Sequence, residues 1–308
     1  MKLTALAGGT GAAKLLRGLS RIMDPRDLTV IVNTGDDAEI WGLHISPDLD
    51  TVSYTLGGVI DEQKGWGLTD ETFHALDQIA RFGEPVWFNL GDRDLATHLH
   101  RTRLLREGRT LTEVTRSLAA ALGVTATVLP MSDQPVRTRI LGPDGWLSFQ
   151  EYFVREKAQV EVRAVDYAGA AASAPAPGVL DAIATADAVL VCPSNPITSV
   201  GPILSVPGLV EALGATPAHV VAVSPIVGGA AVSGPAGRLM ASAGLPVSAV
   251  GVARAYGAWL DRLVFDEQDR ALADQIRAVG VAPVPAPTMM SSRDAEITLA
   301  RHVLSAAA

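Results

Sequence analysis

Short apolar runs that alternate with helical stretches place the strongest constraint on how this chain folds. Each run is followed by glycine or polar residues, and such runs are typical of strands buried on both faces of a parallel sheet. We predict strands at 3–7, 28–33, 86–90, 188–192, 220–224 and 247–250, and helices at 11–22, 69–82, 95–107 and 270–279. Strands that alternate with helices indicate βα units and a mostly parallel sheet.

The middle of the chain has a different pattern. Short strands are predicted at 125–129, 136–141, 146–149 and 160–164, and the segment 142–145, Gly-Pro-Asp-Gly, has the composition of a hairpin turn. We therefore predict an α/β protein with a three-layer, Rossmann-like, mostly parallel sheet and a smaller α/β insertion. The core would comprise 1–109 and 176–308, and the inserted subdomain 110–175, with the Ala/Gly/Pro-rich connector 168–177 at the boundary.

Composition and charge exclude several classes of protein. Hydrophobic residues make up 48% of the 308 residues, which is ample for a sizeable core. The formal net charge is −8 and there is no long basic run, so neither nucleic acid nor an anionic membrane surface is an expected partner. No apolar run approaches the roughly 20 residues of a membrane span, and the first run is broken too early for a secretion signal. We expect a cytoplasmic protein whose single cysteine, Cys192, is a small buried hydrophobic residue.

Residues 8–14, Gly-Gly-Thr-Gly-Ala-Ala-Lys, join the first predicted strand to the first predicted helix. Glycines at such a junction let backbone N–H groups approach an anion at the N-terminus of the helix. The segment does not match the P-loop, and Lys14 replaces the third glycine of the dinucleotide fingerprint. We expect Gly9, Thr10, Gly11 and Lys14 to contact a phosphate or a nucleotide. The alternative is a tight turn without a ligand.

Four aspartates, Asp36, Asp37, Asp48 and Asp50, fall within fifteen residues after the buried run 28–32. Carboxylates at the carboxyl end of a parallel strand lie where open α/β sheets bind their ligands. Close carboxylates repel one another unless a cation compensates, and Mg²⁺ takes oxygen ligands of this kind. The alternative is a set of solvated loop acids. If the loop is extended, Asp48 and Asp50 point to the same face, because side chains alternate along an extended backbone.

Three further polar loops, 89–94, 193–196 and 224–229, follow predicted strands. In the first, Asp92 or Asp94 could cap the next helix, and Arg93 could contact a phosphate or carboxylate. In the other two, serine and asparagine are common turn formers, but at the carboxyl end of a strand they are equally suited to hydrogen-bond a ligand. The candidate site residues in these two loops are Ser194, Asn195, Ser224 and Gly228.

Together these motifs resemble the 2-phospho-L-lactate transferase family of coenzyme F-420 biosynthesis. The matching segments are 7–14, 32–37, 47–51, 54–58, 65–67, 90–98, 129–133, 150–151, 193–197, 201–204 and 224–229, and they cover nearly the whole chain. Each segment is weakly specific alone, but their order and number make the match specific.

The resemblance implies a Mg²⁺-dependent phosphotransferase. Members of the family join a guanosine-diphospho-linked three-carbon acid to the deazaflavin FO, whose ribityl hydroxyl attacks the phosphorus that carries the acid, and GMP is released. The acid is phospholactate, phosphoenolpyruvate or phosphoglycerate, and no residue of the sequence reports which. The implied roles are Asp36 and Asp50 as catalytic residues; Asp36, Asp37 and Asp50 as Mg²⁺ ligands; Asp50, Gly91, Asp92 and Thr97 as FO contacts; and the glycine loop with the loops at Ser194 and Ser224 as GMP contacts. Whether Asp50 orients the hydroxyl or binds the metal is left open.

Two other functions agree with parts of the pattern. A related family of sugar-nucleotide-binding regulators of carbon or cell-wall metabolism shares the glycine loop, a Gly-Asp pair and the Asn-Pro loop, but lacks the blocks at 47–58 and 91–98. A nicotinamide-dependent oxidoreductase is disfavoured because the dinucleotide fingerprint fails. The resemblance also implies a homodimer, for which the apolar segment 197–210 would supply an exposed patch.

Overall fold

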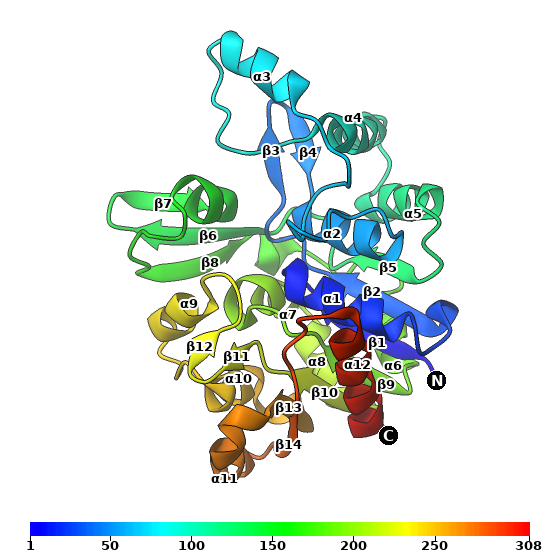
Figure 1. Cartoon of the computed structure of the whole chain (residues 1–308), viewed down its shortest axis with the longest axis vertical. Coiled ribbons are helices and arrows are strands. Elements are labelled where there is room, and N and C mark those ends of the chain that lie inside the picture. Colours follow the sequence, from blue (N-terminus) through cyan, green and yellow to red (C-terminus); the bar gives the residue numbers. More distant parts are fainter.

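Seven strands form one sheet in the computed structural model, which describes residues 1–308. The order across the sheet is β14-β13-β10-β9-β1-β2-β5, and every pairing is parallel (Figure 1). The strands are β1 Leu3–Ala7, β2 Leu28–Val32, β5 Thr127–Pro130, β9 Ala188–Val191, β10 His219–Val223, β13 Arg262–Asp266 and β14 Ala282–Ala286. Counted along the chain, the order is 3-2-1-4-5-6-7. It therefore reverses direction between β1 and β9, as in Rossmann-type sheets.

Helices cover both faces of this sheet, and alternate strand residues divide between the two faces. Ala5 and Ala7 of β1 belong to one apolar cluster, whereas Leu6 belongs to the other. The first face is covered by α1 Gly9–Leu19, α2 Pro47–Leu56, α5 Leu111–Ala121 and α12 Arg293–Ala307, and the second by α6 Val179–Ala184, α7 Gly201–Ser205, α8 Leu209–Ala215, α10 Ala249–Tyr256 and α11 Ala273–Ala278. The predicted three-layer α/β fold is confirmed.

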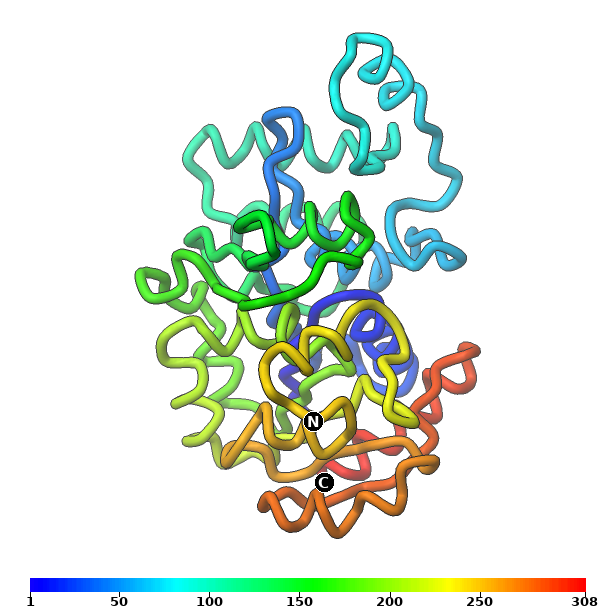
Figure 2. Tube along the Cα trace, turned by 90° about the vertical axis from the view of Figure 1, so that its left-hand side faces the viewer, coloured from blue at the N-terminus to red at the C-terminus, as the bar shows by residue number.

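Two parts of the chain project from the core (Figures 1 and 2). One is the antiparallel sheet β7-β6-β8, with β6 Arg137–Gly142, β7 Gly145–Ser148 and β8 Ala164–Ala168, and a π-helix, η2 Glu151–Arg155, between β7 and β8. The predicted hairpin at 142–145 is confirmed. The other part carries β3 Ala38–Ile40, β4 Leu43–Ile45, α3 His74–Arg81 and α4 Asp92–Arg106. The strand predicted at 125–129 was placed in the insertion, but β5 pairs with β2 at the edge of the main sheet.

Several predicted elements are wrong, for identifiable reasons. Residues 86–90 form no strand. The strand predicted at 247–250 is wrong as well, because α10 begins at Ala249: the Ser248 side chain accepts a hydrogen bond from Gly251 N (3.3 Å) and caps the helix. The helix predicted at 69–82 is shorter in the structure, where only α3, His74–Arg81, is helical. Strand β14 was missed because Pro283 and Pro285 argue against a strand; it is tolerated here as an edge strand. The remaining short elements are η1 Pro25–Asp27, η3 Ala170–Ala172, η4 Pro196–Val200, η5 Gly257–Trp259, η6 Glu267–Leu272, β11 Ile226–Val227, β12 Ala230–Ala231 and α9 Ala236–Ser242.

The apolar segment 197–210 is packed inside the chain's own core. Val200, Ile203, Val206 and Leu209 are each at most 1% exposed and belong to the larger apolar cluster. The expectation that this segment forms an exposed patch is wrong, so the predicted homodimer loses the surface assigned to it and stays a prediction. No single helix is long and apolar enough to span a membrane; only Pro196–Ser205 and Leu209–Ala215 reach that length and composition together, and they are bent by 89°.

Gly18 marks the closest approach of α1 to α12. A Cβ atom at this position would lie 2.5 Å from the backbone oxygen of Glu296. Gly18→Ala should therefore lower the free energy of unfolding by about 1–3 kcal/mol, as overpacked sites do, and lower the midpoint of thermal unfolding. Gly214→Ala in α8 is the matched control, because no atom lies within 4 Å of the added Cβ. It should stabilise the protein by about 0.5–1 kcal/mol. Equal melting temperatures for the two variants would contradict this account.

Candidate functional site

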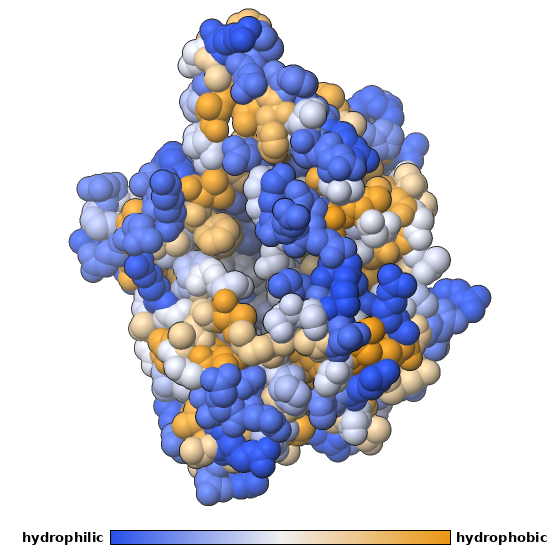
Figure 3. Space-filling view, viewed as in Figure 1, coloured by the Kyte–Doolittle hydropathy of each residue, from blue (hydrophilic) through white to orange (hydrophobic).

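A cavity of about 680 Å³ opens at the carboxyl ends of the strands, beside the point where the strand order reverses. Open α/β sheets bind their ligands at this position. The loops after β1, β9, β10 and β14 form one side of its wall, and the two projecting parts supply the other. Figure 3 shows the hollow near the centre of this face of the molecule.

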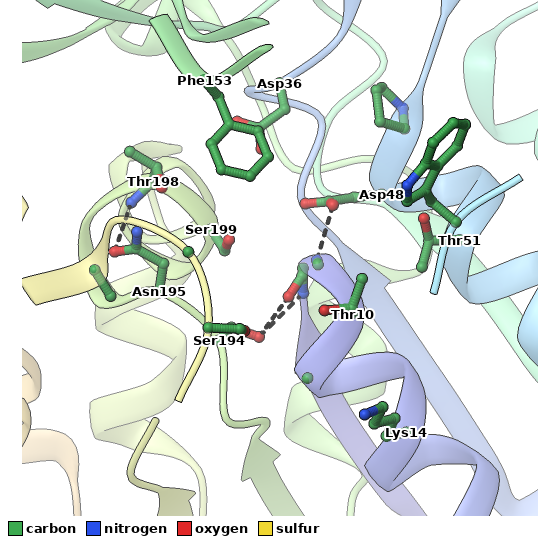
Figure 4. Close-up of a pocket in the computed structure, with 18 of the residues that line it drawn as sticks. Thr10, Lys14, Asp36, Asp48, Thr51, Phe153, Ser194, Asn195, Thr198 and Ser199 are labelled. Carbon is green, nitrogen blue, oxygen red and sulfur yellow. Dashed lines mark hydrogen bonds between the residues drawn. The ribbon is translucent and has the colours of Figure 1, made fainter. Parts of the chain in front are cut away.

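The glycine loop and the loop after β9 are held against each other at the floor of this cavity. Ser194 Oγ donates a hydrogen bond to Gly8 O (2.8 Å) and accepts one from Gly8 N (3.2 Å) (Figure 4). A Cβ atom on Gly11 would lie 2.5 Å from the backbone oxygen of Pro193, so only glycine fits there. Gly9, Thr10, Gly11 and Lys14, which the sequence predicted to contact a phosphate or a nucleotide, all line the cavity.

The loops after β9 and β10 reach the same cavity. Ser194, Asn195 and Ser224 line it. The Asn195 side chain also caps η4, because its Oδ1 accepts a hydrogen bond from Ile197 N (3.0 Å). Gly228 does not belong to the cavity wall, and its N–H donates to Asp269 Oδ2 (3.0 Å).

The aspartate segment is not the extended loop that we expected, because α2 begins at Pro47. Asp48 and Asp50 lie in the first turn of this helix, where residues two apart are separated by about 200° around the axis. The expectation that they share one face is therefore wrong. Both still line the cavity, together with Asp36, but each has different partners.

Asp48 and Asp36 form a buried acidic pair. Asp48 accepts hydrogen bonds from Gly9 N (2.8 Å) and Asn33 Nδ2 (2.8 Å). Burial outweighs these two bonds and raises the pKa of Asp48 to about 6. Burial, followed by the charge of Asp48, raises the pKa of Asp36 well above its ordinary value. Asp36 Oδ1 is buried without any hydrogen-bond partner, so this pair has capacity for a proton or a cation.

Asp37 points elsewhere, although it is adjacent to Asp36 in the sequence. Its Oδ2 accepts a hydrogen bond from Ser46 Oγ (2.9 Å) and lies 3.0 Å from His44 Nε2. The residue is buried but does not line the cavity. Asp37 thus holds the hairpin β3–β4 and the start of α2 together.

Asp50 belongs to a second polar cluster, between α2 and α4. Both of its oxygens accept hydrogen bonds from the guanidinium of Arg101. Asp50, Asp94 and His98 form a group whose ligand atoms all lie within 4.8 Å of one another, a spacing that could hold a metal ion. Tyr54 OH completes the cluster by donating a hydrogen bond to Asp94 Oδ1 (2.6 Å).

The other residues predicted to contact FO lie beside the cavity and not on its wall. Asp92 caps α3, because its carboxylate accepts hydrogen bonds from His74 N and Ala75 N, each at 2.9 Å. Thr97 Oγ1 lies 2.8 Å from Tyr54 OH, whose single proton goes to Asp94, so the Thr97 hydroxyl donates to Tyr54. Of this segment, Asn89, Leu90, Asp94 and His98 line the cavity, whereas Gly91, Asp92 and Thr97 do not.

Sequence reasoning missed the aromatic part of the wall, which is formed by Trp66, Phe88, Phe149 and Phe153. Phe149 and Phe153 stack with ring centroids 5.5 Å apart and planes 11° apart. Phe149 and Phe153 come from the projecting part around β6–β8 and Phe88 from the segment that leads into α4, whereas Trp66 lies in the segment between α2 and α3. No spacing or motif in the sequence brings these rings together. The loop after β14, 288–291, was missed because β14 itself was missed.

The acidic pair predicts how stability depends on pH in the absence of divalent cations. Because folding raises the pKa of Asp36 and Asp48, the folded state binds more protons than the unfolded state between about pH 4 and 7, and the free energy of unfolding falls as the pH rises through that range. Asp36→Asn should flatten this fall and make the protein more stable than the wild type at pH 7.5. Urea unfolding from pH 4 to 8 with EDTA measures it. Asp166→Asn, in a half-exposed ion pair, is the control and should keep the wild-type slope.

Sequence and structure comparisons with known proteins identify the family of this chain. The sequence model of the family described as 2-phospho-L-lactate transferase CofD matches residues 3–299. A phosphoenolpyruvate transferase of Streptomyces griseus subsp. griseus is 45% identical over 313 residues, which cover 100% of this chain and 98% of that protein. A 2-phospho-L-lactate transferase of Methanosarcina acetivorans is 45% identical over 299 residues, covering 97% of each chain.

Among solved structures, a UPF0052 family protein from Bacillus halodurans is similar in fold. It is 18% identical, has a TM-score of 0.65 and covers 98% of both chains. At this identity the likeness shows the fold alone. The family match and the two transferase relatives extend over almost the whole length, so the chain belongs to the CofD family of 2-phospho-L-lactate transferases.

Proposed function

We propose that this protein transfers a phospho-three-carbon-acid group from its guanosine diphosphate derivative to the deazaflavin FO and releases GMP. The observation that carries the proposal is a single cavity in which a helix N-terminus, a buried acidic pair and an aromatic wall meet. Phosphoryl transfer needs charge neutralisation and alignment more than covalent catalysis. The relatives support both phospholactate and phosphoenolpyruvate as the acid, because their names divide between the two.

The guanine nucleotide is assigned to the floor of the cavity. The N-terminus of α1 offers backbone N–H groups and the positive end of the helix dipole to a phosphate. Thr10 and Lys14 add a hydroxyl and a positive charge from the same helix, and Ser194 and Ser224 add hydroxyls from the neighbouring strand ends. These groups are suited to the released GMP and to the diphosphate before transfer.

Mg²⁺ is assigned to Asp36 with Asp48. The residues fit such an ion, because Asp36 Oδ1 has no partner and the donors are carboxylate oxygens. Asp37 and Asp50, which the resemblance also implied as ligands, are engaged by Ser46 and by Arg101. When bound, the ion supplies neutralisation of phosphate charge. It would also offset the repulsion between Asp48, which already caps α1, and a diphosphate at the same helix end.

FO is assigned to the part of the cavity between Asp50 and the aromatic wall. A planar tricyclic ring gains stacking energy on aromatic side chains. Phe88 stands in the segment that leads into α4, near the cluster that contains Asp50, and its ring packs edge-on against Trp87 (centroids 5.7 Å apart). In this arrangement Asp50 accepts a hydrogen bond from the attacking ribityl hydroxyl and orients it.

Product analysis tests the reaction directly. The protein, FO and Mg²⁺ are mixed with each guanylated acid in turn, and mass spectrometry should detect the coupled product and GMP with at least one of them. EDTA should abolish product formation, and restoring Mg²⁺ should recover it. Tight binding of a uridine sugar nucleotide without turnover of any acid would instead support the regulator that the sequence left as an alternative.

Phe88→Ala tests the assignment of the FO ring. Because base–aromatic stacking contributes about 1–3 kcal/mol, the KM for FO should rise roughly tenfold while the KM for the guanylated acid stays unchanged. Phe82→Ala is the matched control from the same segment: Phe82 is 78% exposed and outside the cavity, so both KM values should keep the wild-type level. If instead only the KM for the guanylated acid rises, we would assign the ring of Phe88 to the guanine base and not to FO.

A further inference from the structure

Arg101 lies buried behind Asp50, outside the cavity wall. It is 2% exposed, and no other fully buried side chain is larger. Its Nη1 donates to Asp50 Oδ2 (3.0 Å) and its Nη2 to Asp50 Oδ1. This two-pronged contact fixes the plane of the carboxylate, and one lone pair on each oxygen remains available.

The neighbours of Arg101 hold it from the other side. His98 Nδ1 lies 3.3 Å from Arg101 Nη1. Because a guanidinium can only donate, Nδ1 is the acceptor of this contact, and Nε2 on the other side of the ring lies 3.3 Å from Asp94 Oδ2. Tyr54 OH donates to the other oxygen of Asp94. The guanidinium therefore has contacts with both α2 and α4.

A positive charge already lies against the group formed by Asp50, Asp94 and His98. Two members of this possible metal-binding group, Asp50 and His98, contact the guanidinium of Arg101. A divalent ion placed there would lie against that positive charge, and the repulsion disfavours its binding. The buried arginine and Asp50 compensate each other, whereas either alone would be a costly buried charge.

We propose that Arg101 is a positioning residue for the transfer: it takes the place of a metal ion in this group and orients the Asp50 carboxylate toward the acceptor hydroxyl. The inference rests on the proposed function, since it assigns the hydroxyl to Asp50. In this proposal two cations have separate roles. The fixed guanidinium serves the acceptor side, and the exchangeable Mg²⁺ at Asp36 and Asp48 serves the diphosphate side.

Arg101→Lys is the central test, because lysine keeps the buried charge but cannot bind both carboxylate oxygens in one plane. We expect kcat to fall at least tenfold, with the KM for the guanylated acid and the Mg²⁺ concentration for half-maximal rate unchanged. In Arg101→Ala, millimolar guanidinium should restore part of the lost kcat. Wild-type kcat in Arg101→Lys, or a shifted Mg²⁺ requirement, would overturn the proposal.

A double-mutant cycle separates positioning from folding. If Arg101 acts through Asp50, the Arg101→Lys change should alter kcat much less in an Asp50→Asn background than in the wild type; independent, multiplicative losses would overturn the proposal. Arg17→Ala is the structural control, because Arg17 makes a similar two-pronged, partly buried contact with Glu296, outside this cavity. This variant should lower the thermal stability but leave kcat unchanged and unresponsive to guanidinium.

The two proposals fail in different ways. If the wild-type protein makes no product, the proposed function itself is refuted. If the wild type is active and Arg101→Lys has the same kcat, only the role of Arg101 is refuted.

Discussion

The carboxylate of Asp48 connects the segments on which the rest of the site depends. From the first turn of α2 it accepts hydrogen bonds from the N-terminus of α1, through Gly9, and from the end of β2, through Asn33. These two bonds fix the position of α2 above the sheet. They also bury the Asp48 carboxylate beside Asp36. Burial raises the pKa of both acids, so ionisation of the pair is unfavourable unless a cation is bound. The architecture and the need for a counter-charge thus have the same origin.

The sequence predicted most of the sheet because β1, β2, β9 and β10 are nearly continuous apolar runs, which are typical of strands buried on both faces. It also placed the polar loops 193–196 and 224–229 at the carboxyl ends of two of these strands, and the carboxyl ends of parallel strands share one edge of the sheet. It failed where composition and structure disagree. Strand β14 contains two prolines, and 247–250 is an apolar run that a serine cap turns into a helix.

The partners of the site residues were beyond the reach of sequence reasoning. Arg101 and Asp50 are fifty-one positions apart, and α4 carries charged residues all along its length, so no periodic pattern marks Arg101 as the buried one. The four aspartates look equivalent in the sequence. The structure assigns them to three environments: Asp36 with Asp48, Asp37 with Ser46, and Asp50 with Arg101. Only packing distinguishes an acid that lacks a counter-charge from one that already has it.

The contact between Gly8 and Ser194 affects which part of the cavity wall changes shape most easily. It joins the loops after β1 and β9, the two strands between which the strand order reverses. Gly11 and Pro193 are also packed so closely that these two loops have no room to move relative to each other. The floor is therefore stiff, whereas α3 buries none of its residues and the segment around it is mostly exposed. Local opening costs least in such loosely packed segments. The free-energy cost of a change in shape is therefore lowest at the rim, whereas the glycine loop at the floor keeps its shape.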